Sequence, residues 1–316
     1  MQNVTSESVS IPSYAVVHSL LATKYLAGSG LICVLWDHVL TFKDEVQYIW
    51  LRKQLDLVKI IFLMNRYSNE ASLIYAAYIF AGLHGPEQLN QQVRYSSMPL
   101  TSELTVYMQS CVNFVTVIAV FAVISISTAN VFMTLRHYVI WDRRRTAMIA
   151  LWIAFAISYT IILVLFILTV LDVRKHALYS PILDTCTLSR KSYTLMGIWA
   201  CMFAFDVFTL ILAITNALER PYRHHVDVII NFKRDGAAFF LALTSLRLMN
   251  LAFSIWMGPE DTFLVSFFVW GMISLTLSRL ILRVEHIRAQ TSQTGGTGVH
   301  LFEMDQWRVE RYDGGY

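Results

Sequence analysis

The chain has 316 residues, of which 56% are hydrophobic and only 15% are charged. Since about a quarter of the residues of a water-soluble protein are charged, this composition excludes an ordinary soluble protein and indicates a surface that faces lipid. The net charge of +3 is too small to indicate a nucleic-acid partner.

Seven apolar segments reach or approach the 20 or so residues that a helix needs to cross the hydrocarbon core of a membrane. They lie at residues 16–36, 56–83, 107–135, 147–171, 194–218, 236–257 and 262–283. All six prolines fall outside these segments or at their edges, as continuous helices require. We therefore predict an all-α membrane protein with a seven-transmembrane-helix bundle over residues 16–283. Tails at residues 1–15 and 284–316 flank it, the second one largely flexible.

The first segment contains Gly28 and Gly30, which predict close packing against another helix. A separate amphipathic stretch follows it at residues 41–55. We predict that this stretch forms a short helix at the membrane surface, with Ile49 and Trp50 among the side chains that enter the interface.

The second segment is the weakest, because Asn65, Arg66, Asn69 and Glu70 interrupt it. A charged residue at the centre of a membrane helix costs about 2.5–3.5 kcal/mol on insertion scales. Arg66 and Glu70 are four residues apart, so they share a helix face and are expected to pair.

The distribution of basic residues predicts the orientation. Of the 25 lysines and arginines, 15 fall in the first, third and fifth loops and the C-terminal tail, with Arg283 counted at the start of the tail. Five fall on the opposite side, and the other five, Arg279 among them, lie within the segments. Short cytosolic loops carry the basic excess, so we predict an external N-terminus and a cytosolic C-terminus. The cytosolic basic face consists of Arg136, Arg143, Arg144, Arg145, Arg220 and Arg223. These arginines either anchor the chain to membrane lipids or contribute to docking a cytosolic signalling partner.

Two cysteines are predicted to face the oxidising compartment, Cys111 at the external end of the third helix and Cys186 in the following external loop. We predict a disulfide between them, with two unpaired thiols as the alternative. Cys33 and Cys201 lie inside predicted helices and are interpreted as small apolar residues. Asn3 begins a glycosylation sequon in the N-terminal tail.

Ionisable residues inside a membrane are functional candidates by default. Asp206 and Arg247 are expected at similar depth in the fifth and sixth helices. We predict that they form an internal polar network with Glu70 and Arg66 of the second helix. The network either recognises a ligand or switches conformation, or it is a satisfied ion pair that fixes helix packing.

No motif indicates an enzyme. The close histidine pair His224–His225 has no third partner for a metal, and neither a Gly-rich phosphate loop nor a G-x-S-x-G nucleophile motif is present. The seventh segment contains no lysine that could hold retinal. We therefore expect no catalytic site, no metal and no cofactor.

The stretch WDHVLTFKDEVQYIW, from Trp36 to Trp50, resembles fungal, mostly basidiomycete, membrane proteins whose N-terminal segment is catalogued as a domain of unknown function. The second helix continues the resemblance with Asn65–Arg66–Tyr67, and the end of the third with residues 135–145. The motif residues are Asp37, Glu45, Trp50, Arg66 and Tyr67, while His38 and His137 depart from the usual pattern. The resemblance implies a seven-helix fold and a fungal source, and no activity.

The predicted topology, the disulfide and the basic end of the third helix are also similar to G-protein-coupled receptors. However, the seventh helix lacks an Asn-Pro-x-x-Tyr motif and the sixth lacks the usual proline. Our leading hypothesis is a receptor-like or sensor-like protein, in the plasma membrane rather than an internal one, that couples an external ligand to cytosolic partners. The alternatives are a transporter or channel that uses the intramembrane network, and a structural membrane protein.

Overall fold

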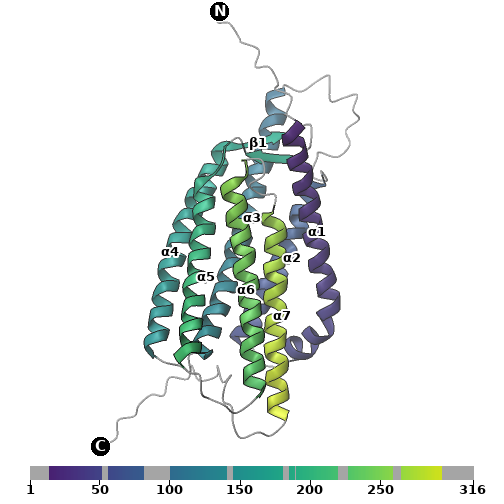
Figure 1. Ribbon diagram of the computed structural model, residues 1–316. Helices are drawn as coiled ribbons and strands as arrows, with labels where there is room; N and C mark the ends of the chain where they lie inside the picture. Colours follow the sequence, from purple (N-terminus) through teal and green to yellow (C-terminus); the bar gives the residue numbers. More distant parts are fainter. Residues whose placement is uncertain are drawn as a thin grey trace, which may run out of the picture.

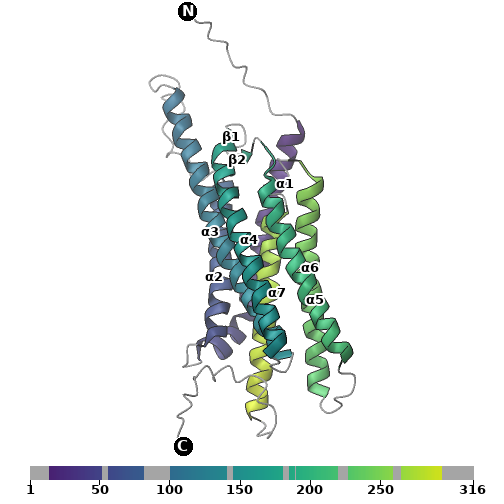
Figure 2. The ribbon, with the colours of Figure 1, turned by 90° about the vertical axis from the view of Figure 1, so that its left-hand side faces the viewer.

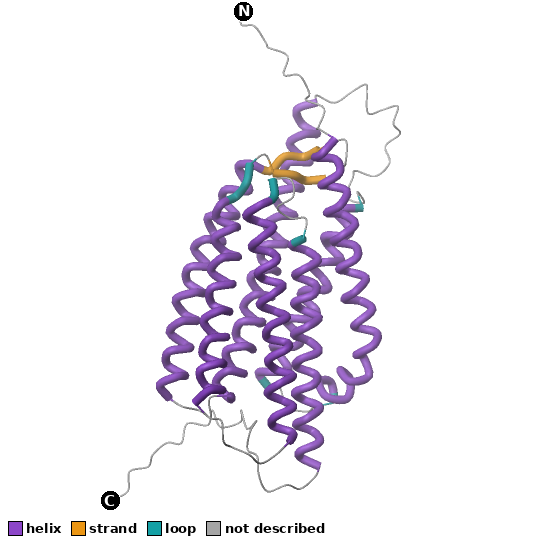
Figure 3. The backbone as a smooth tube through the Cα atoms, in the orientation of Figure 1, coloured by secondary structure: helices purple, strands orange, loops and turns teal. Residues whose placement is uncertain are grey.

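The computed structural model describes residues 14–51, 56–81, 100–140, 145–180, 185–188, 190–219, 227–258 and 265–293. Over this part of the chain, seven α-helices run alongside one another in one bundle (Figure 1). They are α1 (Tyr14–Glu45), α2 (Leu57–Phe80), α3 (Leu100–Ile140), α4 (Arg145–His176), α5 (Tyr193–Glu219), α6 (Asp227–Trp256) and α7 (Ser266–Gln293). A short antiparallel hairpin, β1 (Ala177–Ser180) and β2 (Thr185–Leu188), lies across the end of the bundle at which α1 begins (Figure 3). We call this the hairpin end.

Six of these helices are long and apolar enough to cross a membrane, judged by length and composition. The exception within the described residues is α2, which is the segment that polar residues interrupt. The protein is therefore a multi-pass integral membrane protein, as its composition predicted.

Successive helices are neighbours around the bundle, and α7 closes it by packing against α1, α2 and α6 (Figures 1 and 2). In the apolar 18-residue stretch of α7, 67% of the residues are buried, whereas in that of α4 only 11% are. The outer face of α4 is a row of exposed isoleucines, Ile149, Ile153, Ile157 and Ile161. The helix α7 is thus the central element, and α4 presents most of its apolar surface to lipid.

Close packing of α1 on α7 depends on two glycines. A Cβ atom on Gly30 would lie 3.1 Å from the Cα atom of Phe268, and one on Gly271 would lie 3.2 Å from the side chain of Val34. A Cβ atom on Gly28 would meet nothing within 4 Å. The prediction of close helix packing is therefore confirmed for Gly30 and wrong for Gly28.

A matched pair of substitutions tests this contact. Gly30→Val is expected to lower the free energy of unfolding by about 1–3 kcal/mol, because the added atoms must push the α7 backbone away. Gly28→Val, two residues earlier in the same helix, is expected to leave stability unchanged or slightly raised, since valine has the higher helix propensity. Thermal unfolding of the two purified variants in detergent measures the difference. Equal melting temperatures would contradict the packing role of Gly30.

The expected surface helix at residues 41–55 is wrong. Instead α1 continues to Glu45 and passes directly into a π-helical turn, η1 (Val46–Trp50). Ile49 is buried in the core and does not enter the interface, although Trp50 is half-exposed. The reason is that Glu45 is fully buried, which ties this segment to the bundle.

Most helices extend beyond the predicted apolar segments at one end or at both, because a helix does not end where its hydrophobicity does, whereas α2 lies within its predicted segment. The largest change is at the C-terminus, where α7 continues to Gln293. Residues 284–293 are therefore helical and not part of a flexible tail. Residues 294–316 lie outside the described part of the chain, so the rest of that prediction is not tested.

The hairpin contacts α3 through β1. Cys111 of α3 is buried, and the free thiols among the described residues are those of Cys33 and Cys201. The side chain of Cys186, on β2, lies outside the described residues, as does Asn3. The Cys111–Cys186 disulfide and the glycosylation site therefore stay predictions.

Candidate functional site

Nine side chains from α1, η1, α2 and α7 form a largely buried polar group in the half of the bundle away from the hairpin, which we call the Arg66 cluster. Its members are Asp37, His38, Thr41, Glu45, Trp50, Arg66, Tyr67, Glu70 and Arg279. All five motif residues of the sequence analysis belong to it. The motif residues therefore lie together at one site of the folded chain.

Glu45 is the centre of the cluster. One carboxylate oxygen accepts a hydrogen bond from the Tyr67 hydroxyl at 2.6 Å and one from the Trp50 indole at 2.9 Å. The other oxygen lies 3.3 Å from Nε of Arg66. A buried carboxylate is tolerated only with such partners, since burying an isolated charge costs far more than a hydrogen bond returns.

The π-helical turn explains how Trp50 reaches this carboxylate. In a π-helix the backbone bonds run from residue i to residue i+5, and Trp50 is five residues after Glu45. The two side chains therefore lie on one face of the turn. In a regular α-helix the residue above Glu45 would be the one four positions later.

Arg66 also contacts α1 through Nη2. Nη2 donates to the Thr41 hydroxyl at 2.8 Å and lies 3.9 Å from a carboxylate oxygen of Asp37. The second oxygen of Asp37 accepts from Nε of Arg279 on α7 at 2.5 Å. Two arginines therefore join three helices through the acidic residues of α1.

His38 lies between the carboxylates of Glu45 and Glu70. Its Nδ1 atom is 2.7 Å from Glu70, and its Nε2 atom is 3.7 Å from Glu45. Glu70 is also 3.6 Å from Nε of Arg66, so the predicted pair at spacing i, i+4 is confirmed. With three carboxylates and two guanidinium groups, the cluster is one positive charge short when His38 is neutral.

A second polar group lies on the other side of the bundle, and we call it the Arg247 triad. Nη1 of Arg247 on α6 donates to Asp206 on α5 at 2.6 Å, and Nη2 donates to Asn130 on α3 at 2.8 Å. All three residues are buried. One guanidinium thus holds three helices together, and the prediction that Asp206 and Arg247 lie at similar depth is confirmed.

The single network predicted from the sequence is wrong. Among the described residues, no hydrogen bond or ion pair joins Glu70 or Arg66 to the Arg247 triad. The physical reason is the helix order, because α2 packs on α1, α3 and α7, whereas α5 packs on α4 and α6. The charged residues on each side of the bundle therefore pair with neighbours on that same side.

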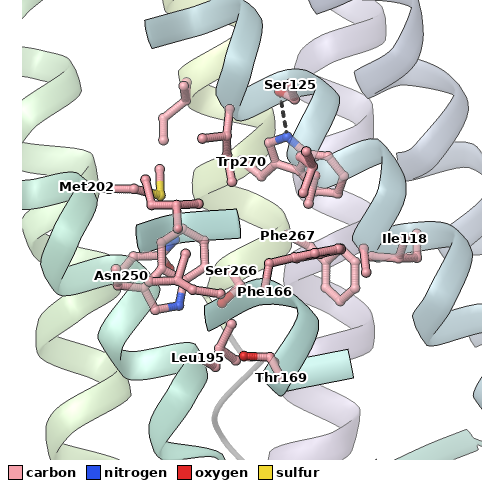
Figure 4. A pocket seen from close by; sticks show the side chains of 18 of the residues that line it. Ile118, Ser125, Phe166, Thr169, Leu195, Met202, Asn250, Ser266, Phe267 and Trp270 are labelled. Atoms are coloured by element: carbon pink, nitrogen blue, oxygen red, sulfur yellow. Dashed lines mark hydrogen bonds between the residues drawn. The ribbon is translucent and has the colours of Figure 1, made fainter. Parts of the chain in front are cut away.

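An apolar cavity of about 140 Å³ lies next to the triad, between α3, α4, α5, α6 and α7, and we call it the α3–α7 cavity. Figure 4 shows Phe166, Met202 and Phe267 among its apolar walls. The indole of Trp270, also in the wall, donates to the Ser125 hydroxyl at 2.8 Å (Figure 4). Among the described residues that line the cavity, Arg247 is the charged one.

The sequence reasoning missed Asn130, His38 and Arg279. Arg279 was counted as a charge inside a span, which marks it as a candidate, and it pairs with Asp37. His38 belongs to the quoted stretch, where it departs from the usual pattern of the resemblance. Nothing in the sequence distinguishes Asn130 from the other polar residues of α3. The side chains of the cytosolic basic face lie outside the described residues, so that prediction is not tested.

Residues 25–68 match a family of unknown function, DUF6533. The match covers the part of α1, η1 and α2 that supplies most of the Arg66 cluster, and it ends before Glu70. This confirms the N-terminal segment of unknown function that the resemblance named. Searches of the curated proteins and of the solved structures found no significant match.

Proposed function

We propose that the chain is a seven-span receptor-like protein of the plasma membrane that binds a small ligand in the α3–α7 cavity and signals to cytosolic partners. The observation that carries the proposal is the double role of Arg247. This residue lines the cavity and also holds Asp206 and Asn130, so it links an occupant to the packing of α3, α5 and α6.

Counting α2 as the seventh span is supported by the direction of its side chains. Five of its polar residues are buried, and one of them, Asn65, donates to Ser274 and Ser278 of α7; Lys59 and Ser68 are partly buried. Its exposed large side chains are all apolar or aromatic: Leu57, Ile60, Met64, Ile74 and Tyr78. The mean hydropathy of the helix does not reveal that its polar and apolar side chains lie on different faces. A helix with an apolar outer face and paired inner charges can cross lipid.

With seven spans, the distribution of basic residues among the loops supports an orientation with the hairpin end outside the cell. The cavity then lies in the outer half of the bundle, since its walls come from the hairpin-side halves of α4 to α7. The Arg66 cluster lies in the inner half. A ligand from outside and a partner from inside would therefore act on opposite halves of one bundle.

Coupling between the halves requires an element with two arrangements that a ligand can bias. The Arg247 triad is the candidate, because its three helices are joined by two hydrogen bonds from a single guanidinium group. A ligand that contacts the free face of Arg247 would change the balance between these bonds.

Proximity labelling from the C-terminus in cells tests the proposal. The wild-type chain is expected to recover heterotrimeric G-protein subunits or arrestin-like proteins in a stimulus-dependent way. The double variant Asp206→Leu/Arg247→Met, which removes the link but leaves no buried charge, is expected to recover them several-fold less at equal surface expression. Arg174→Met, at an exposed position of α4, is the control and should behave as wild type.

Recovery of no signalling protein under several stimuli would contradict the receptor proposal. Flux of a substrate across proteoliposomes that contain the purified chain would favour the transporter instead. The receptor proposal expects no flux above that of empty liposomes.

A further inference from the structure

Three residues that line the α3–α7 cavity carry buried hydrogen-bond donors that have no acceptor in the described part of the chain. They are Nδ2 of Asn250 on α6, Nε1 of Trp199 on α5 and Nε of Arg247. All three residues line the cavity, and Asn250 is only 3% exposed. A buried donor without a partner costs about as much as a lost hydrogen bond, so each of them favours an acceptor in the cavity.

The three atoms share one chemistry. An indole nitrogen and a guanidinium nitrogen can only donate, and Nδ2 is the donor end of the asparagine amide. The other tryptophan of the wall, Trp270, already donates to Ser125. The unpartnered polar atoms of the lining residues therefore favour an oxygen or nitrogen acceptor.

The charge at the site argues against an anion. The guanidinium of Arg247 is 2.6 Å from the carboxylate of Asp206, so the pair carries no net charge. The rest of the wall is almost entirely apolar. An anionic ligand would lose its hydration without gaining a free cation, which makes an uncharged ligand the better fit.

The volume limits the size of the occupant. A dry engineered cavity of about 150 Å³ in another protein holds one benzene ring. At about 140 Å³, the α3–α7 cavity holds a similar number of atoms. The occupant is therefore about as large as a single six-membered ring with one small substituent.

We propose that the α3–α7 cavity binds a small, uncharged, mainly apolar molecule with one acceptor oxygen, such as a ketone, an ester or an ether. Asn250 and Trp199 recognise the oxygen, and the apolar walls enclose the rest. This inference rests on the proposed receptor function and names the class of ligand for it. Binding of that ligand can be measured without any signalling partner.

Two probes of the same shape test the proposal. Acetophenone carries a carbonyl oxygen, and α-methylstyrene carries a methylene group in its place. Equilibrium dialysis of the full chain in nanodiscs, corrected with empty nanodiscs, measures both affinities. We expect acetophenone to bind about tenfold more tightly, which corresponds to roughly one buried hydrogen bond.

Variants separate recognition of the oxygen from filling of the cavity. Asn250→Leu is expected to reduce acetophenone affinity to about that of α-methylstyrene and to leave α-methylstyrene unchanged. Trp199→Phe, which removes the indole N–H group, is the second variant and should act in the same direction. Ala122→Phe places a ring in the cavity and should abolish binding of both probes. Asn113→Leu, at an exposed position of α3, is the matched control and should change neither affinity.

Equal affinity for the two probes would overturn the proposal, because it would mean that the oxygen is not recognised. Binding that survives Ala122→Phe would place the probes in the lipid or at another site, which would also overturn it. These measurements use no signalling partner. Binding without partner recovery would therefore contradict only the receptor function, and partner recovery without binding would contradict only the ligand class.

Discussion

Arg66→Met is expected to lower the free energy of unfolding by about 3–5 kcal/mol, the cost of removing one partner from a buried ion pair. Arg66 is the cation nearest to Glu45 and Glu70 and also bonds Thr41. Methionine would leave the Glu45 carboxylate in the core without a neighbouring guanidinium. Denaturant or thermal unfolding of the purified variant in detergent measures the loss, and the yield of folded protein from cells should fall with it.

Two comparisons make this prediction specific. Arg66→Lys keeps the charge but loses the planar set of donors, so its melting temperature is expected between those of wild type and Arg66→Met. Arg66→Met/Glu45→Gln should lose less than the sum of the two single variants, because the second change removes the carboxylate that the first one leaves unpaired. If Arg66→Met is no less stable than Arg174→Met, whose side chain is exposed, the cluster does not stabilise the fold.

The second large effect is expected at the Arg247 triad. Arg247→Met leaves Asp206 buried without its partner, and Asp206→Asn leaves the guanidinium without a countercharge, so each should cost about 3–5 kcal/mol. Asp206→Leu/Arg247→Met should be much closer to wild type, because replacing a whole buried pair by apolar side chains is often neutral. Unfolding of the single and double variants, measured side by side, tests this non-additivity.

The same variants distinguish a structural pair from a functional one. If the pair only fixes helix packing, the double variant should be stable and should recover cytosolic partners as wild type does. If the pair couples ligand to partner, the double variant should be stable but should recover them several-fold less. If neither single variant loses stability or changes any cellular phenotype, both interpretations of the pair are wrong.

The candidate site was partly predictable from the sequence. The motif residues Asp37, Glu45, Trp50, Arg66 and Tyr67 were singled out by a pattern in the chain, and the structure brings them into one cluster. Their convergence was not predictable, because Trp50 reaches Glu45 only through a π-helical turn that hydropathy does not reveal. The α3–α7 cavity was not predicted either, since its wall comes from five helices and no local pattern marks it.

The amino-acid sequence by itself determined that this chain is a helical, multi-pass membrane protein and which ionisable residues interrupt its apolar segments. It could do so because length, hydropathy and charge are properties of each segment alone. Only the tertiary structure decided which charges meet. Helix order separates Glu70 from Asp206, and the rotation of each helix directs a side chain to lipid or to a partner. Residues far apart in the chain, such as Asp37 and Arg279, pair only because α1 packs on α7.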